Sequence, residues 1–178
     1  MEVYAYTRTP RPTPESRADT SGYCVPGTGD VEGAIPAAWF SGDLDEFLAQ
    51  DLDIVVVSAG LTDQTRGMVG KRQLEILGGD GVAGRKKGFL CNIARGPIVD
   101  TSALIEALEK GTIAGAALDV TDPEPLPKGH PLWKAPNLFI SPHVSWQSTN
   151  VMPRVADLLQ SNLERLDKGE PLLNLIKK

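Results

Sequence analysis

Short apolar runs that alternate with helical and turn segments make up most of the chain after residue 52. The runs at 53–58, 89–94 and 114–120 are rich in β-branched, aliphatic and small residues, a composition that predicts strands. Because the run at 53–58 is continuously apolar, we expect that strand to be buried on both faces. Aromatic and β-branched residues at 2–7 predict an earlier strand, and 138–143 predicts the last one.

Helical patterns lie between these strands. Asp100 is a candidate N-cap, Leu104, Ile105 and Leu108 fall on one face, and Gly111 gives a stop signal. Asp43 precedes a similar short pattern. The helices expected from these signals span 44–50, 70–79, 100–111 and about 147–168.

The segment 10–42 has a different composition. Five prolines and five glycines fall within it, so we expect no regular element over most of its length. Loops of this length are uncommon and are usually functional or mobile.

Alternating strands and helices predict an α/β fold with a parallel sheet. Ligands bind beyond the carboxyl ends of the strands in such sheets. A polar residue ends or follows each expected strand, and we therefore expect these five residues to face one crevice. They are Arg8, Ser58, Arg95, Asp119 and His143.

Three side chains near these strand ends suggest a chemistry. Arg95 presents a rigid fork of donors that suits a carboxylate. His143 is of the residue type that exchanges a proton near neutral pH, and Glu124, in the loop before the last strand, could reach its ring and fix the tautomer. Together they suggest a site that reduces a carbonyl or oxidises an alcohol once a hydride source is supplied.

Composition narrows the class of partner. The 178 residues are 41% hydrophobic and 23% charged, the balance of a globular protein, and the formal net charge is −5. Without a basic stripe, we expect a small-molecule ligand and neither nucleic acid nor a membrane as partner. The two cysteines have no metal-ligand spacing, so we expect no metal site, and the lack of a leader or apolar span favours the cytoplasm.

Two stretches resemble a known family. "CNIARGPIVDTSALIEALEKGTIAGAALDVTDPEPLP" and "NLFISPHVS" are similar to the NAD(P)-binding domain of the D-isomer-specific 2-hydroxyacid dehydrogenases, which include glyoxylate/hydroxypyruvate reductases. The resemblance runs from about residue 2 to the C-terminus. It implies a Rossmann-like, doubly wound parallel sheet that transfers hydride between NAD(P)H and a small 2-oxo or 2-hydroxy acid.

The resemblance also assigns roles to individual residues. It implies that Arg95 binds the substrate carboxylate, that His143 is the general acid/base and that Glu124 is its partner. A glutamate at 124 argues against the similar formate dehydrogenase branch, which has glutamine there. The residues that it implies at the cofactor, besides Arg95 and His143, are Ser58, Ala59, Thr65, Ile93, Ala94 and Asp119, the last of these for the nicotinamide carboxamide.

Arg8 bears on the choice of cofactor. NAD-preferring relatives usually end the equivalent strand with an acid for the ribose hydroxyls, whereas this chain has Thr7 and Arg8. Because an arginine can pair with a ribose 2′-phosphate, NADP is favoured over NAD.

The chain departs from the family pattern at its start. Nothing before residue 2 supplies the first strand, the G-x-G-x-x-G turn and the first helix, and "PGTGDVEG" (26–33) lacks a strand before it and a helix directly after it. We therefore expect 1–178 to form a partial NAD(P)-binding domain, with 10–42 as a long loop, 147–178 as the C-terminal helix and tail, and no separate substrate domain.

Two functions remain open. One is the dehydrogenase, and the other is a non-catalytic nucleotide-binding or dimerisation remnant of such an enzyme. A homodimer is compatible with both, because family members commonly dimerise through this domain.

Overall fold

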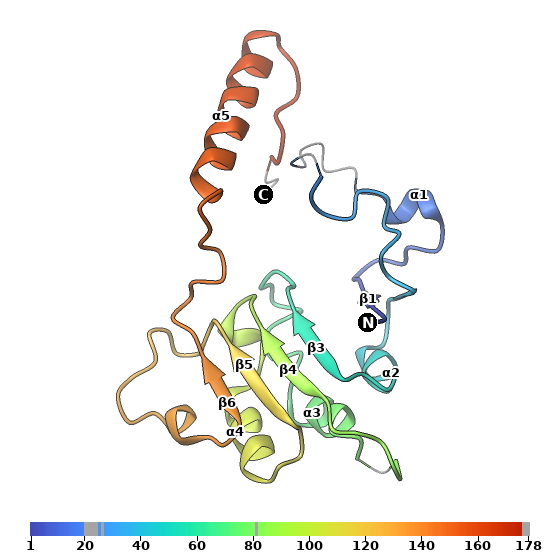
Figure 1. Ribbon diagram of the computed structural model, residues 1–178, viewed down its shortest axis with the longest axis vertical. Coiled ribbons are helices and arrows are strands. Elements are labelled where there is room, and N and C mark those ends of the chain that lie inside the picture. Colours follow the sequence, from blue (N-terminus) through green and yellow to red (C-terminus); the bar gives the residue numbers. More distant parts are fainter. Residues whose placement is uncertain (20–24, 26, 81, 176–178) are drawn as a thin grey trace. The chain divides into compact units, whose positions relative to one another are not determined.

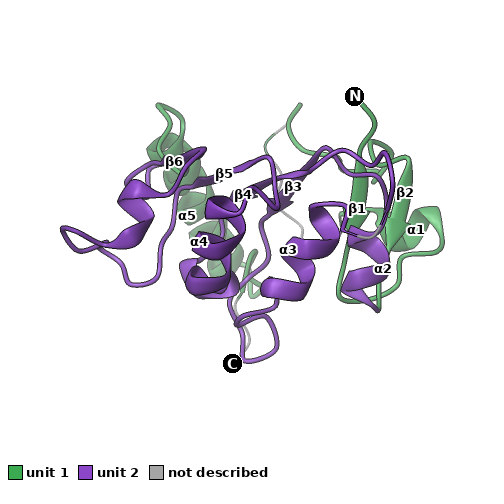
Figure 2. Cartoon of the chain, turned by 90° about the horizontal axis from the view of Figure 1, so that it is seen from below, with its two compact units in different colours: residues 1–42, 146–178 green, residues 43–145 purple. Residues whose placement is uncertain are grey.

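The computed structural model describes residues 1–19, 25, 27–80 and 82–175, and the chain divides into two compact units. Unit 1 comprises Met1–Gly42 and Trp146–Lys178, and unit 2 comprises Asp43–Ser145 (Figure 2). The expectation of one partial domain over 1–178 stays a prediction.

Unit 2 is built on a four-stranded parallel sheet with the order β3-β4-β5-β6. The arrowheads in Figure 1 point to the same edge of this sheet. This arrangement confirms the predicted α/β class. The strands are β3 (Ile54–Val57), β4 (Phe89–Asn92), β5 (Gly115–Leu118) and β6 (Leu138–Ile140).

Helices return the chain between these strands. The Asp100 side chain accepts a hydrogen bond from the Ala103 amide at 2.9 Å, and Gly111 ends the helical turn at φ 60°, so both predicted boundary signals are confirmed. The helical elements of unit 2 are α2 (Leu44–Leu48), α3 (Lys71–Leu77), η1 (Gly96–Ile98), α4 (Thr101–Glu109) and η2 (Pro131–Lys134).

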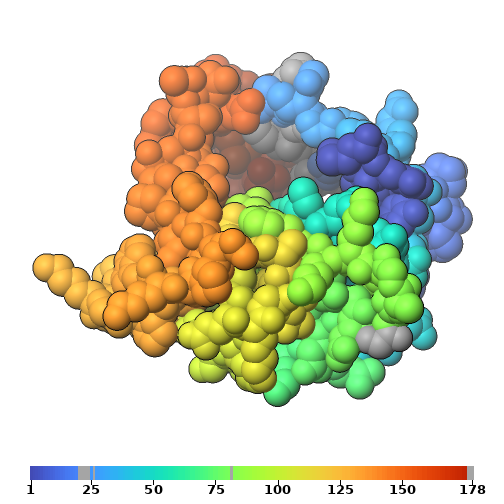
Figure 3. All heavy atoms as spheres, turned by 60° about the horizontal axis from the view of Figure 1, so that its bottom comes forward, coloured from blue at the N-terminus to red at the C-terminus, as the bar shows by residue number. Residues whose placement is uncertain are grey.

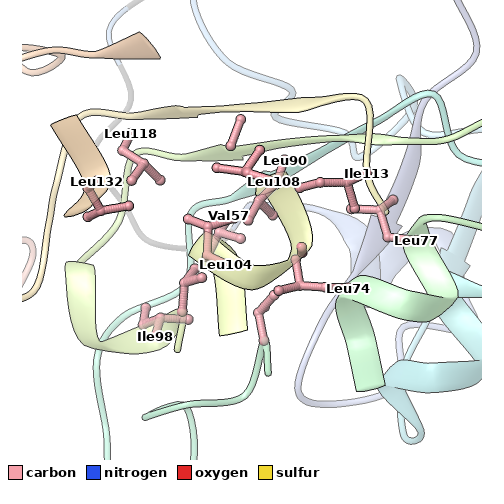
Figure 4. Packing of buried hydrophobic residues seen from close by; sticks show 14 of the residues in the cluster. Val57, Leu74, Leu77, Leu90, Ile98, Leu104, Leu108, Ile113, Leu118 and Leu132 are labelled. Atoms are coloured by element: carbon pink, nitrogen blue, oxygen red, sulfur yellow. The ribbon is translucent and has the colours of Figure 1, made fainter. Parts of the chain in front are cut away.

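The core of unit 2 lies between the sheet and the helices α3 and α4, which cover the same face (Figures 2 and 4). Leu90 of β4 lies at the centre of this core and is 0% exposed. Alternate strand residues point into this layer, as the two-residue period of a strand requires. Its labelled members in Figure 4 are Val57, Leu74, Leu77, Leu90, Ile98, Leu104, Leu108, Ile113, Leu118 and Leu132.

The prediction that residues 53–58 are buried on both faces is wrong. Ile54 is 59% exposed and Val56 is 54% exposed, whereas Val57 is buried. Phe139 of β6 is 67% exposed. The cause is that α3 and α4 both pack on one face of the sheet, so residues that alternate with the core positions point the other way.

Unit 1 contains a second, two-stranded parallel sheet of β1 (Tyr4–Tyr6) and β2 (Ala38–Phe40). The strand expected at 2–7 is confirmed. β2 and the single-turn helix α1 (Pro14–Arg17) lie in the segment expected to be mostly irregular, and sequence analysis missed both. α1 tolerates its proline because Pro14 occupies the first helical position, where no amide donor is needed.

The last helix, α5 (Val151–Asp167), starts four residues later than predicted. Pro153 gives the physical reason. A proline deep inside a helix would clash with the preceding turn and remove a hydrogen bond, so the helix begins where Pro153 falls in its first turn. None of the helices in the described ranges is both long and apolar enough to cross a membrane.

Core packing yields a stability prediction. Leu90→Ala should lower the free energy of unfolding by roughly 2–5 kcal/mol, because it opens a cavity beneath the sheet. Phe139→Ala, which truncates an exposed residue of the same sheet, is the matched control and should cost less than about 1 kcal/mol. Urea unfolding followed by circular dichroism measures both, and equal losses would contradict the one-sided core.

Candidate active site

Four of the five expected strand-end residues lie at one edge of the unit 2 sheet. Ser58 directly follows β3, and Asp119 directly follows β5. Arg95 lies three residues after β4, and His143 lies three residues after β6. Because the strands are parallel neighbours, their carboxyl ends share this edge. Arg8 follows β1 in unit 1, so its place in the crevice stays a prediction.

The loop that carries Arg95 is shaped by a buried asparagine. Asn92 is 1% exposed, its Nδ2 donates to the Arg95 carbonyl at 3.0 Å, and its Oδ1 accepts from the Ala94 amide at 3.1 Å. A buried amide satisfied in this way fixes the turn that follows β4. In the sequence, Asn92 stands out only as part of the stretch that begins "CNIARG", although a polar amide at the end of an apolar strand is itself a signal.

The Arg95 side chain is exposed, and its Nη1 donates to the Ala94 carbonyl at 2.6 Å. No ion pair neutralises this guanidinium within the described ranges. A cation at this edge that forms no ion pair with a described acid is suited to binding an anion.

The loop from β5 to η2 packs tightly against the Arg95 loop. A Cβ at Gly96 would lie 2.0 Å from the Thr121 carbonyl oxygen, so only glycine permits this approach. Thr101 Oγ1 donates to the Asp122 carbonyl at 3.0 Å, and Thr121 Oγ1 donates to the Pro123 carbonyl at 2.9 Å. These contacts fix the chain just before Glu124. Beyond it, the segment between β5 and β6 projects from unit 2 (Figure 3).

Glu124 and His143 form a close pair. The distance from His143 Nδ1 to Glu124 Oε1 is 2.6 Å, and the two side chains are 38% and 37% exposed. A carboxylate at this distance accepts the Nδ1 proton and so fixes the tautomer of the ring. The contact expected between these two residues from sequence is therefore present.

Asp119 is buried, with 5% of the residue exposed. Burial alone would raise the pKa of its carboxyl group. Hydrogen bonds from Ser141, from Ser145 and from the Val144 and Ser145 amides outweigh that effect and hold the pKa well below the ordinary range of an aspartate. Asp119 is thus ionised inside the protein.

The other residues implied at a cofactor site follow β3 and β4. Ile93 is 44% exposed and Ala94 is buried, both directly after β4. Ser58 and Ala59 are exposed, and Thr65 closes a turn by donating from Oγ1 to the Gly60 carbonyl at 2.8 Å. The structure thus places them along the carboxyl edge from β3 to β4, and their contacts to a cofactor stay predictions.

This edge therefore presents the Arg95 guanidinium and the carboxylate–imidazole pair of Glu124 and His143. Such a combination can hold a small acid and exchange a proton with it. Among the described side chains, no group of three or more histidine, cysteine, aspartate or glutamate residues is arranged to hold a metal ion.

Comparison with known proteins identifies the family. Residues 30–145 match the family model described as "D-isomer specific 2-hydroxyacid dehydrogenase, NAD binding domain". A glyoxylate reductase of Thermofilum pendens is 41% identical over 149 residues, which is 84% of this chain and 41% of that protein. A glycerate dehydrogenase of Methylorubrum extorquens is 39% identical over 131 residues, or 72% of this chain and 39% of that protein.

Solved structures agree with this assignment. A D-isomer specific 2-hydroxyacid dehydrogenase from Xanthobacter autotrophicus Py2, in complex with NADPH and MES, has a TM-score of 0.72 at 34% identity and covers 99% of this chain and 61% of that one. A probable 2-hydroxyacid dehydrogenase from Rhizobium etli, in complex with NADP, HEPES and L(+)-tartaric acid, has a TM-score of 0.68 at 32% identity, covering 84% and 45%.

The chain spans about two fifths of the length of these two curated relatives. The family match extends over the whole of unit 2, which carries Glu124 and His143. The chain belongs to the D-isomer specific 2-hydroxyacid dehydrogenase family, and the match covers its NAD-binding domain.

Proposed function

We propose that this chain acts as an oxidoreductase that transfers a hydride between NAD(P)H and a small 2-oxo or 2-hydroxy acid, such as glyoxylate or hydroxypyruvate. The observation that carries the proposal is the 2.6 Å contact between His143 Nδ1 and Glu124 Oε1 at the sheet edge that also presents Arg95. Family membership supports the same reaction class.

Arg95 binds the substrate in this proposal. Its guanidinium pairs with the carboxylate of the acid and polarises the neighbouring carbonyl oxygen. The absence of an ion pair in the described part of the chain leaves the arginine charge for this task.

His143 moves the proton. Since Glu124 engages Nδ1, proton exchange with the carbonyl or alcohol oxygen of the substrate falls to Nε2. During reduction the protonated ring gives a proton to the oxygen as the carbonyl carbon gains a hydride, and Glu124 stabilises the charged ring before the transfer. Oxidation of the alcohol runs the same steps in reverse.

The chain's residues fit a nicotinamide cofactor at this edge. Ile93 offers a 44% exposed apolar side chain beside the Arg95 loop, which suits the flat face of a ring, and the carboxyl edge of a parallel sheet suits a dinucleotide. When bound, the cofactor supplies or accepts the hydride. Ile93, Ala94 and Asp119 would hold its nicotinamide end, and Ser58, Ala59 and Thr65 would border the adenosine and pyrophosphate.

Glyoxylate or hydroxypyruvate is favoured over formate as substrate because residue 124 is a glutamate. Formate dehydrogenases are similarly close in sequence, since the mitochondrial enzyme of Solanum tuberosum is 40% identical over 144 residues. Overall sequence identity therefore does not separate the two substrate classes, and the choice between them rests on residue 124. Homodimer formation and a cytoplasmic location, both expected from sequence, belong to this proposal as predictions.

The second candidate is a non-catalytic nucleotide-binding or dimerisation module. The observation in its favour is that residues 30–145 match the family's NAD-binding domain, a domain that binds a nucleotide. Cofactor binding without turnover would support this module, and turnover would exclude it.

Cofactor preference is tested first. Titration of the purified chain, followed by nicotinamide fluorescence, should give tighter binding of NADPH than of NADH. Arg8→Ala should weaken NADPH binding roughly 5- to 50-fold and leave NADH unchanged, because it removes one charge-assisted contact to the 2′-phosphate. Lys86→Ala removes the same charge from an exposed residue just before the amino end of β4 and is the control. Binding of neither cofactor would refute the proposal for this chain.

Arg95 is tested on turnover. Arg95→Ala should lower kcat/KM for glyoxylate about 100-fold or more, since a charged contact to the substrate is lost. Lys86→Ala again controls for loss of a positive charge. An unchanged kcat/KM in Arg95→Ala would remove this residue from the substrate site.

The acid–base pair is tested with two isosteric changes. His143→Gln should lower kcat roughly 10²- to 10⁴-fold with cofactor binding retained, because the proton donor is lost. Glu124→Gln should cost less, since a glutamine oxygen still accepts the Nδ1 proton without its charge. Steady-state kinetics measures both, and a larger loss for Glu124→Gln than for His143→Gln would contradict the assigned roles.

A further inference from the structure

The loop that carries His143 is wrapped around the carboxylate of Asp119. Asp119 Oδ1 accepts from Ser141 Oγ at 2.6 Å and from the Val144 amide at 2.9 Å, while Oδ2 accepts from the Ser145 amide at 2.9 Å. The Asp119 backbone carbonyl accepts from the His143 amide at 2.9 Å. One residue at the end of β5 therefore holds four donors within the segment 141–145 after β6.

These bonds hold an unfavourable backbone conformation in place. His143 has φ 55°, in the left-handed region that side-chain-bearing residues seldom adopt. Such a conformation persists where its surroundings over-determine it, and the hydrogen bonds on both sides of residue 143 do so here. In this conformation the ring meets Glu124.

The charge of Asp119 strengthens the arrangement. An ionised carboxylate accepts amide and hydroxyl hydrogen bonds about twice as strongly as a neutral group, and burial shields these bonds from water. Asp119 forms no ion pair with any described residue, so the hydrogen bonds to residues 141–145 are the main contacts of its carboxylate.

We propose that Asp119 and Ser141 are positioning residues for His143: by holding residues 141–145 around the Asp119 carboxylate, they keep the imidazole of His143 in contact with Glu124. This inference rests on the proposed function, in which His143 moves the proton. It assigns Asp119 a task in addition to the carboxamide contact expected from the family resemblance.

The test is the tautomer of His143 in the full chain. The chain has two histidines, so ¹⁵N–¹H correlation spectra of the rings need only separate His143 from His130, and His143→Gln makes that assignment. Above the titration range of histidine, wild-type His143 should show the Nδ1-protonated tautomer, because Glu124 accepts that proton.

Two variants break the loop contacts in different ways. Asp119→Asn removes the charge and turns an NH2 group toward the Ser141, Val144 and Ser145 donors. Ser141→Ala removes one of these donors and keeps the Asp119 charge. Both should convert His143 largely to the Nε2-protonated form that a free ring prefers. Asp122→Asn, the same change at an exposed aspartate of the neighbouring loop, is the control and should leave the spectrum unchanged. Should Asp119→Asn not fold, Ser141→Ala still decides the matter.

Amide hydrogen exchange gives a second readout. Asp119→Asn should lose protection at Val144 or Ser145 by about tenfold or more, because asparagine keeps only one of the two oxygens that accept from these amides. Unchanged tautomer and exchange in both variants would overturn the positioning role while leaving the proposed function intact. Failure of the wild type itself to show the Nδ1-protonated form would instead refute the His143–Glu124 pair of the proposed function, and the positioning role with it.

Acid unfolding tests the charge on Asp119. Its folded-state pKa lies below that of the unfolded chain, so its stabilisation is complete above about pH 4 and is lost as pH falls toward the folded-state value. Unfolding in urea at several pH values should therefore show a shallower loss of stability below pH 4 for Asp119→Asn than for Asp122→Asn. Parallel curves would contradict an ionised, hydrogen-bonded Asp119.

Discussion

Parallel pairing of β3, β4, β5 and β6 is the constraint on which the rest of unit 2 depends. Parallel neighbours cannot be joined by tight turns, so each connection must cross the sheet and return, and helices α3 and α4 make two of these returns. Every strand consequently ends at the same edge. Parallel pairing alone therefore brings residues that are far apart in sequence, such as Arg95 and His143, to that edge.

Loops with few degrees of freedom then position the chemical groups. Gly96 allows the Thr121 backbone to approach, Thr101 holds the Asp122 carbonyl, and Asp119 holds the segment that carries His143. Each contact joins the end of one strand to the loop of another. Because the Glu124 and His143 side chains are 37% and 38% exposed, their geometry depends on these buried backbone contacts more than on their own packing.

Much of unit 2 was predictable from sequence because its signals are local. The apolar runs of the strands, the Asp100 cap and the Gly111 stop each act within a few residues, and the strand-end rule then placed Ser58 and His143. What sequence missed depends on long-range packing. The exposure of Ile54 and Val56 follows from which face the helices cover, β2 exists because β1 pairs with it, and the bonds of Asp119 join residues 22 to 26 positions apart.

Hydride transfer by this chain is the central claim, and isotope transfer tests it most directly. NADPH deuterated at C4 of the nicotinamide is incubated with glyoxylate and the purified chain, and the glycolate formed is analysed by mass spectrometry. We expect glycolate carrying one deuterium on carbon with the wild-type chain and a large loss of that product with His143→Gln. Absence of labelled glycolate from the wild-type chain, or an equal yield from the variant, would contradict it.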